Sequence, residues 1–171
     1  MHASERTIDQ LLAAATSRVP LAGTDGKSGS WLERIEVDGS TYVVKHQSIA
    51  DDWLMHTAGD EVFWVHRLWR DGFFDALPAD IDAAIRDMAP ETAPGTDPDG
   101  GAPADRLAIL LDDVGPSLIP EGDDPVDGAT HAGLIDSMAS LHATFWDWRD
   151  HLGLQTMRRR LLMFAPATIA P

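Results

Sequence analysis

A short segment near the N-terminus has the residue types that bind phosphate groups. It is GTDGKSGS, Gly23 to Ser30, with three glycines, one lysine and two serines. Glycines allow backbone N–H groups to approach a phosphate closely, and a lysine ammonium neutralises its charge. Two unrelated nucleotide-binding designs use segments of this kind, and the elements around the segment decide between them.

The first design is the P-loop, with the pattern G-x-x-x-x-G-K-[ST]. Gly26, Lys27 and Ser28 supply its second half, but Leu21 stands where the first glycine belongs. A P-loop also needs a helix directly after the lysine, because the helix N-terminus holds the phosphates. The residues that follow Lys27 favour a strand, so a nucleotide hydrolase of this type is the less favoured alternative.

The second design is the glycine-rich loop between the first two strands of a protein kinase. A hairpin, a lysine on the third strand and a helix with a glutamate follow that loop. Lys45 in YVVKH comes after a predicted hairpin, and Glu61 lies in the next predicted helix. This order predicts that Lys45 binds phosphates and pairs with Glu61. The predicted phosphate contacts in the loop are Ser28, Gly29 and Ser30.

The elements expected around the loop follow from local patterns. Thr7 and Gln10 have the spacing of a capping box. Apolar residues at helical spacing then predict a helix that runs to Pro20: Ile8, Leu11, Leu12, Ala15 and Val19. WLERIEV alternates as a strand in which Glu33 interrupts the apolar face, and TYVVK predicts a second strand. Asp38-Gly39 between them is a two-residue hairpin signal.

From Asp51 onward the chain alternates helices, loops and a buried strand. We expect a helix from Asp51 to Asp71, capped by Thr57 or Asp60 and ended by Gly72. Ala83 to Met88 fits a helix or a strand, and Pro90 to Asp105 has the composition of a mobile surface loop. RLAILLDDVG predicts a buried strand. The clearest helix spans Thr130 to Trp148, with a wide apolar stripe: Leu134, Ile135, Met138, Leu141, His142, Phe145 and Trp146.

Taken in order, these segments resemble the N-terminal part of the aminoglycoside phosphotransferase-like, or choline-kinase-like, branch of the protein kinase superfamily. The residues that carry the resemblance are GKSGS, YVVK, EVFWVHRL, LAILLDDVG and SLHATFW. It implies an α+β fold, with a kinase-like small lobe of antiparallel sheet plus helix over residues 1–114. Residues 115–171 would then be the first helices of the large lobe. LAILLDD would be the fifth strand, followed by a hinge where backbone groups of Asp112 and Val114 bind adenine.

The resemblance implies transfer of the γ-phosphoryl group of ATP, with Mg²⁺, to a hydroxyl of a small molecule. Lys45 would orient the phosphates and Glu61 would hold Lys45. Such enzymes use an Asp in an H-x-D-x-x-x-x-N loop as base and a second Asp for Mg²⁺. The chain contains no H-x-D. We therefore expect a truncated N-terminal part that lacks the catalytic Asp and the Mg²⁺ ligands, and no metal site within the chain.

Composition narrows the classes of partner and compartment. With 28 acidic and 13 basic residues the net charge is −15, which disfavours nucleic acids and anionic membranes as partners. The absence of cysteine excludes disulfides and zinc-thiolate sites. No apolar run is long enough to cross a bilayer, and the first residues lack the pattern of a secretory signal. We expect a cytoplasmic protein.

One alternative function stays open. A non-catalytic acidic α+β module would bind a protein partner through the apolar helix near the C-terminus. The same stripe, if exposed, would also favour self-association.

Overall fold

Five strands form a single antiparallel sheet in the order β1-β2-β3-β5-β4. The structure is a computed structural model that describes residues 7–21, 29–91, 105–119, 124–154, 156 and 161. The strands are β1 Ser17–Pro20, β2 Trp31–Val37, β3 Ser40–Ser48, β4 Ile85–Glu91 and β5 Arg106–Asp112. The α+β class expected from the sequence is confirmed.

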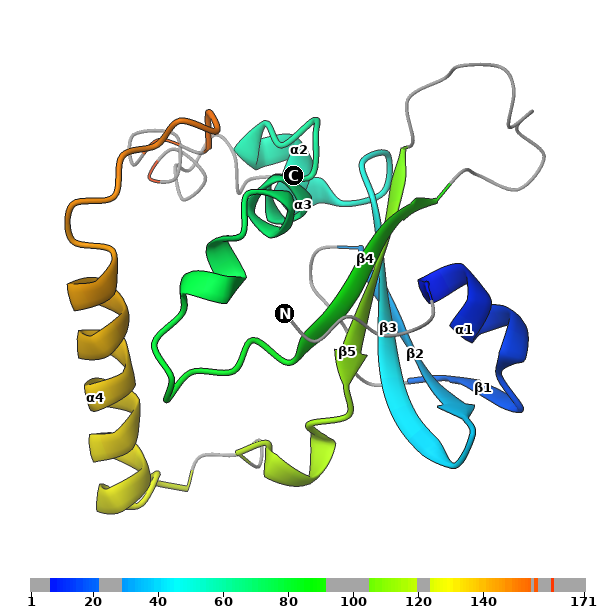
Figure 1. Cartoon of the computed structure of the whole chain (residues 1–171), viewed down its shortest axis with the longest axis horizontal. Coiled ribbons are helices and arrows are strands. Elements are labelled where there is room, and N and C mark those ends of the chain that lie inside the picture. The colour runs from blue at the N-terminus through cyan, green and yellow to red at the C-terminus, as the bar shows by residue number, and fades with distance from the viewer. Residues whose placement is uncertain are drawn as a thin grey trace.

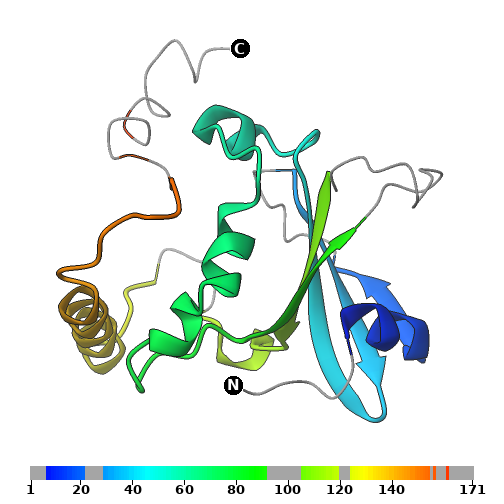
Figure 2. The same ribbon diagram turned by 45° about the horizontal axis from the view of Figure 1, so that its top comes forward.

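The helices lie on both faces of this sheet. Helix α1, Ile8–Ala14, covers one face, and α2, Trp53–Ala58, α3, Trp64–Arg70, and the 3-10 turn η1, Phe73–Ala76, lie on the other (Figures 1 and 2). A second 3-10 turn, η2, Gly115–Ser117, follows β5. Helix α4, Gly128–Thr144, stands beyond α3 and η1, away from the sheet.

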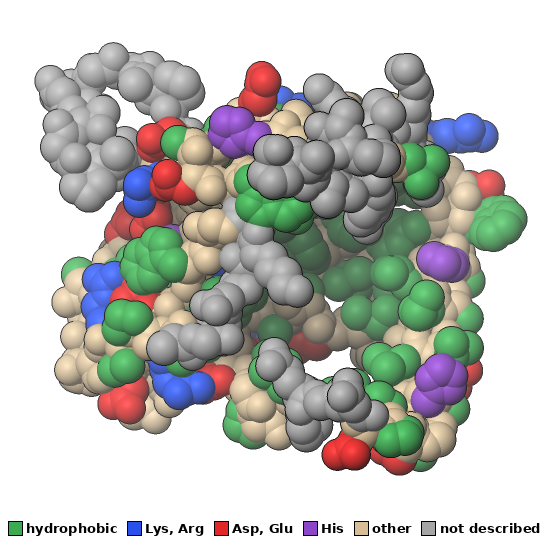
Figure 3. Space-filling view, turned by 180° about the vertical axis from the view of Figure 1, so that it is seen from behind, with side chains coloured by type: hydrophobic (Ala, Val, Ile, Leu, Met, Phe, Trp, Pro, Cys, Tyr) green, Lys and Arg blue, Asp and Glu red, His purple; other side chains and the backbone are tan. Residues whose placement is uncertain are grey.

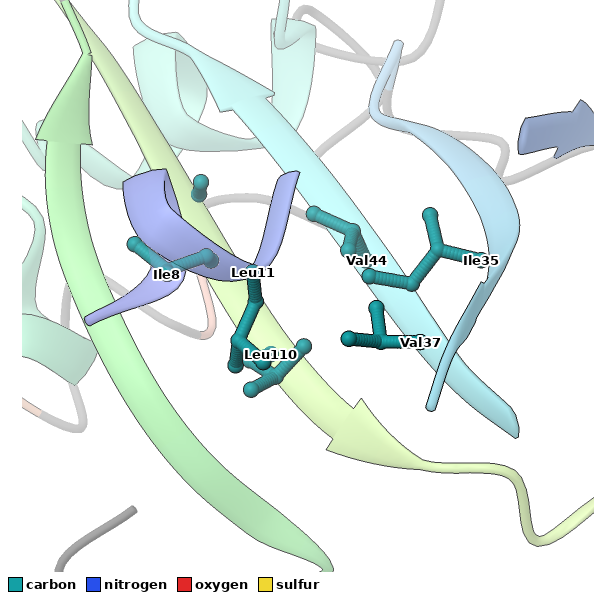
Figure 4. Close-up of a cluster of buried hydrophobic side chains, with 7 residues drawn as sticks. Ile8, Leu11, Ile35, Val37, Val44 and Leu110 are labelled. Carbon is teal, nitrogen blue, oxygen red and sulfur yellow. The ribbon is translucent and has the colours of Figure 1, made fainter. Parts of the chain in front are cut away.

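Two apolar clusters hold the layers together. Under α1, one cluster joins helix and sheet (Figure 4): Ile8, Leu11, Ile35, Val37, Val44, Ala108 and Leu110. On the opposite face, the second cluster joins β4 and β5 to the helical segment: Met55, Phe63, Met88, Leu107 and Ile109. In β2 the buried positions alternate with exposed ones, as expected for a strand with one face on a core. This alternation determines which strand residues face α1 and which face α2 and α3.

The first helix is shorter than the sequence indicated. The capping box of Thr7 and Gln10 is present, but α1 ends at Ala14. The next residues form β1, which pairs with β2 so that Ser17 lies opposite Glu36. Val19 is 55% exposed, so it does not extend the apolar stripe of the helix. The prediction of a helix to Pro20 was wrong because hydrogen bonds to β2, a distant partner, outweigh the local helical spacing.

The hairpin between β2 and β3 is confirmed. Its two turn residues, Asp38 and Gly39, have φ angles of 51° and 79°. Two successive positive φ angles are typical of a type I′ turn, whose twist matches that of the flanking strands.

The single helix predicted from Asp51 to Asp71 is two helices. Gly59, with φ 70°, ends α2 in the left-handed conformation. The Asp60 carboxylate then accepts the N–H of Trp64 at 3.0 Å, which begins α3. Asp52 caps α2, whereas Asp60 satisfies the start of α3. Gly72, with φ 77°, follows α3 as expected.

The remaining elements follow the sequence more closely. The segment from Ala83 to Met88 fitted either a helix or a strand, and it contributes to strand β4. LAILLDD is the fifth strand, β5, as expected. Residues 92–104, most of the predicted surface loop, lie outside the described residues. The long helix α4 begins at Gly128, capped by Asp127, and ends at Thr144 rather than Trp148.

Candidate functional site

Lys45 lies near the middle of β3. It is opposite Leu32 on β2 and Ile109 on β5. Residues opposite each other on neighbouring strands share a face of the sheet. Its side chain therefore lies on the face of Ile109, which packs against α2 and the residues before α3. Lys45 is half-buried, and its ammonium has no hydrogen bond or ion pair with any described residue. A half-buried cation without a partner is suited to binding an anion.

The end of the glycine-rich loop is anchored to the turn after β3. Gly29 has φ +95°, and a Cβ at this position would lie 2.3 Å from the Asp51 carbonyl oxygen. The hydroxyl of Ser30 donates to Asp52 Oδ2 at 3.0 Å, and both residues are buried. Gly29 and Ser30 thus have a packing role that the sequence did not indicate. Ser28, also a predicted phosphate contact, lies outside the described residues.

The order of elements around this loop separates the two nucleotide-binding designs. The loop connects β1 to β2, and β2 begins at Trp31, directly after Ser30. A strand, not a helix, therefore follows the glycine-rich segment. The P-loop interpretation is wrong, because it requires a helix N-terminus at the phosphates.

Glu61 is not in the middle of a helix. It lies in the connection between α2 and α3 and is exposed. Its carboxylate has no hydrogen bond or ion pair with a described residue, Lys45 included. The break at Gly59 and Asp60 moves Glu61 out of the helical register in which it was expected to approach Lys45.

The predicted hinge follows β5 as a turn. Asp112 donates its backbone N–H to the Ala84 carbonyl at 2.9 Å, and its carboxylate pairs with Arg86. The Val114 carbonyl accepts the Ser117 N–H at 2.8 Å. The Val114 N–H has no partner among the described residues, and the residue is 44% exposed. Of the backbone groups expected to bind adenine, this N–H is the one that the fold leaves open.

Sequence reasoning missed a partly buried ionic group, which we call the His46 cluster: Arg18, Glu33, His46 and Glu91. Glu33 accepts Arg18 Nε at 2.9 Å and His46 Nε2 at 3.0 Å. His46 Nδ1 donates to Glu91 at 2.9 Å. The cluster connects β1, β2, β3 and β4, and crosses β5 at the small residue Ala108. The glutamate that interrupts the apolar face of β2 was the signal that pointed to it.

The geometry of the cluster requires a charged histidine. Both ring nitrogens of His46 face carboxylates, and only an imidazolium donates from both. Burial alone would lower the pKa of His46, but the hydrogen bonds to Glu91 and Glu33 outweigh it and raise the pKa. Burial likewise favours a higher pKa for Glu33, but Arg18 and His46 outweigh it, so the pKa is lowered. Trp31 stacks on His46 with ring centroids 3.9 Å apart.

A third feature is an apolar cavity of about 500 Å³ beside α4. The residues that line it come from α3, η1, α4 and the segment after α4: Leu68, Phe73, Leu141, His142, Phe145, Trp146, Trp148 and Leu154. Phe73 and Phe145 stack with centroids 4.3 Å apart. Polar contacts connect the two walls, from Arg67 to the Leu152 carbonyl at 2.9 Å and from His151 to Asp71 at 3.0 Å. Figure 3 shows hydrophobic side chains around the hollow.

The part of the chain that the structure describes holds no group of three or more His, Cys, Asp or Glu residues placed to bind a metal. Among the same residues, no helix is both long and apolar enough to span a membrane. Comparisons of the chain with protein-family models, with curated proteins and with solved structures give no match.

Proposed function

We propose that the chain is the nucleotide-binding part of an ATP-dependent phosphotransferase that acts on a hydroxyl of a small molecule, similar to the aminoglycoside phosphotransferases. The observation that carries the proposal is the half-buried ammonium of Lys45, unpaired in the described structure, on the face of the sheet next to the helical segment. Triphosphates carry several negative charges, and such an ammonium offsets them.

The order of elements supports the same proposal. In protein kinases a glycine-rich loop covers the phosphates, the phosphate-binding lysine lies on the third strand, and a helix follows that strand. Here the glycine-containing loop joins β1 to β2, Lys45 is on β3, and α2 follows β3. The open N–H of Val114 after β5 offers a donor for adenine. These residues bind and orient a nucleotide.

The proposal assigns no Mg²⁺ ligand and no catalytic base to the chain. The described residues contain no cluster suited to a metal ion, and the sequence contains no H-x-D. Phosphoryl transfer depends on metal ions that bridge the phosphate oxygens and on a base that orients the acceptor. We therefore propose nucleotide binding without transfer for this chain, in the cytoplasm, where ATP is available.

Thermal unfolding with and without MgATP tests the proposal. Nucleotide at 100 times its Kd adds about 2.7 kcal/mol to the free energy of unfolding. We expect this stabilisation for the wild-type chain and for Arg149→Ala, which removes an exposed cation elsewhere. We expect it to be lost in Lys45→Ala. Equal stabilisation of both variants, or none in the wild-type chain, would contradict the proposal.

A second candidate function is a protein-binding module that uses α4. The observation in its favour is that α4 has no buried residue, while Leu134, Ile135 and Met138 are 49%, 51% and 56% exposed. A helix with an uncovered apolar stripe next to an apolar cavity is suited to a protein contact, either with another protein or with a second copy of the chain.

A further inference from the structure

A second polar side chain lies beside Lys45 on β3. Gln47 follows Lys45 by two positions, and side chains two positions apart in a strand lie on the same face. Gln47 is opposite Leu107 on β5, as Lys45 is opposite Ile109. Both side chains therefore extend over the same part of β5, next to α2.

The side-chain oxygen of Gln47 has no partner. Its Oε1 is buried from solvent and accepts no hydrogen bond from the described residues. A buried carbonyl oxygen without a donor costs free energy and requires an explanation. An ammonium group, with three donors and no acceptor, is the chemical complement of such an oxygen.

The oxygen of Gln47 and the ammonium of Lys45 are complementary, and neither has a partner among the described residues. Lys45 lacks the glutamate expected to hold it, because Glu61 lies in the connection between α2 and α3. We propose that Gln47 holds Lys45, an inference that rests on the proposed nucleotide site. The Gln47 Oε1 accepts a hydrogen bond from the Lys45 ammonium when nucleotide phosphates bind the other N–H groups of that ammonium. Gln47 is thus a positioning residue. A neutral amide orients the ammonium without neutralising it, so the full positive charge remains for the phosphates.

The chain offers an unusually simple probe for this contact. It contains two lysines, Lys27 and Lys45, so ¹⁵Nζ-lysine labelling gives two ammonium signals, and Lys45→Ala assigns them. We expect MgATP to slow hydrogen exchange of the Lys45 ammonium in the wild-type chain. We expect the same in Thr41→Val, a control at an exposed position on the same face of β3. Gln47→Leu should lose the effect, and Gln47→Glu, which keeps an acceptor, should retain it.

Affinity and stability should move in opposite directions in Gln47→Leu. Loss of a hydrogen bond to a charged group weakens MgATP binding by about tenfold. Replacing the unpaired amide with a leucine should leave the midpoint of thermal unfolding equal or higher, because the buried unsatisfied oxygen is gone. A purely structural role of Gln47 would instead lower the midpoint and leave the Lys45 ammonium signal unchanged.

Measurements on the wild-type chain and on Gln47→Leu separate the role of Gln47 from nucleotide binding. If the wild-type chain binds MgATP, and Gln47→Leu binds it equally with the same protected ammonium signal, the role of Gln47 is overturned and nucleotide binding stands. If MgATP changes neither the unfolding midpoint nor the Lys45 signal of the wild-type chain, both are overturned.

Discussion

His46 shows how a single buried charge can organise several strands. Its imidazolium contacts Glu33 on β2 and Glu91 on β4, and Glu33 in turn contacts Arg18 on β1. The four side chains together carry two positive and two negative charges, which compensate for the desolvation of each. Glu33 and His46, the two buried members, each bind two partners, so removing the charge of either one takes a partner from the other.

The stability of the chain should depend on the ionisation of this cluster. The folded pKa of His46 is raised above 6.5, so its contribution is complete below pH 6.5 and is lost as the pH rises through the folded pKa. The folded pKa of Glu33 is lowered below 4.5, so its contribution is complete above pH 4.5 and is lost as the pH falls through the folded pKa. We expect the contribution of the cluster to the free energy of unfolding, measured in urea, to be largest between about pH 4.5 and 6.5.

His46→Gln provides the comparison. His151 also has a raised pKa, through Asp71, and burial lowers that of His66, so only the difference between the wild-type chain and the variant reports on His46. That difference should shrink as the pH rises above 6.5. A difference that stays constant up to pH 9, well beyond the ordinary range for histidine, would show that the imidazolium does not stabilise the fold.

Gly29 is constrained by both its conformation and its surroundings. Its φ is +95° and a Cβ would lie 2.3 Å from the Asp51 carbonyl oxygen. Gly29→Ala should lower the free energy of unfolding by about 1–3 kcal/mol or more, as measured in urea. Gly39→Ala is the matched control, since Gly39 has φ +79° with no atom within 4 Å of the added Cβ. If both variants lose the same stability, the contact with Asp51 carries no constraint.

At the scale of elements, Asp52 connects the loop before β2 to the start of α2. One carboxylate oxygen accepts the N–H groups of Leu54 and Met55 at 2.9 and 3.0 Å. The other accepts the Ser30 hydroxyl. The residue is 2% exposed, so no water replaces these bonds. The position of Ser30 relative to β3 thus depends on the cap of a short helix.

Asp52→Ala should therefore cost more than the loss of an ordinary helix cap. A cap alone contributes about 1 kcal/mol, and loss of the buried hydrogen bond between Ser30 and Asp52 adds about 1 kcal/mol or more. Asp127→Ala, which removes the exposed cap of α4, gives the reference value. Urea unfolding of both variants makes the comparison. Equal losses would mean that the contact between Ser30 and Asp52 contributes nothing.

At the scale of the whole molecule, α4 is a long helix that the described residues leave mostly exposed. None of its residues is buried, and its apolar stripe continues from the cavity beside α3 and η1. Large exposed apolar areas are typical of interaction surfaces. The rest of the described chain is held by the sheet and by the clusters on its two faces. In the described part of the chain, Leu134, Ile135 and Met138 of this stripe are exposed and available for contacts with another molecule.

This arrangement predicts self-association through α4. Light scattering should show a molar mass that increases with concentration for the wild-type chain. Met138→Glu places a charge in the stripe and should reduce the mass to that of a monomer. Ala143→Glu adds the same charge at an exposed small residue of α4 outside the stripe and should have little effect. A wild-type chain that stays monomeric at all concentrations would contradict this prediction.

The sequence alone determined those features that depend on neighbouring residues. Thr7 with Gln10, Asp38 with Gly39 and the alternation of β2 each act within a few positions, so their patterns predicted a cap, a hairpin and a strand correctly. The sequence also predicted the order of the loop, the hairpin and the strand that carries Lys45. Local signals work here because the hydrogen bonds that they imply form within the same turn or hairpin.

Tertiary structure alone decided how distant segments meet. The residues after Ala14 form β1 because they pair with β2 around Glu36. The hydrogen bonds of this pairing outweigh the helical spacing of the apolar residues. The contact of Ser30 with Asp52, the His46 cluster and the buried oxygen of Gln47 all depend on strand register. Register determines which side chains share a face, and it is set by the packing of the whole sheet. For that reason Lys45 lies beside Gln47 on one face of β3, while Glu61, the expected partner of Lys45, lies in the connection between α2 and α3.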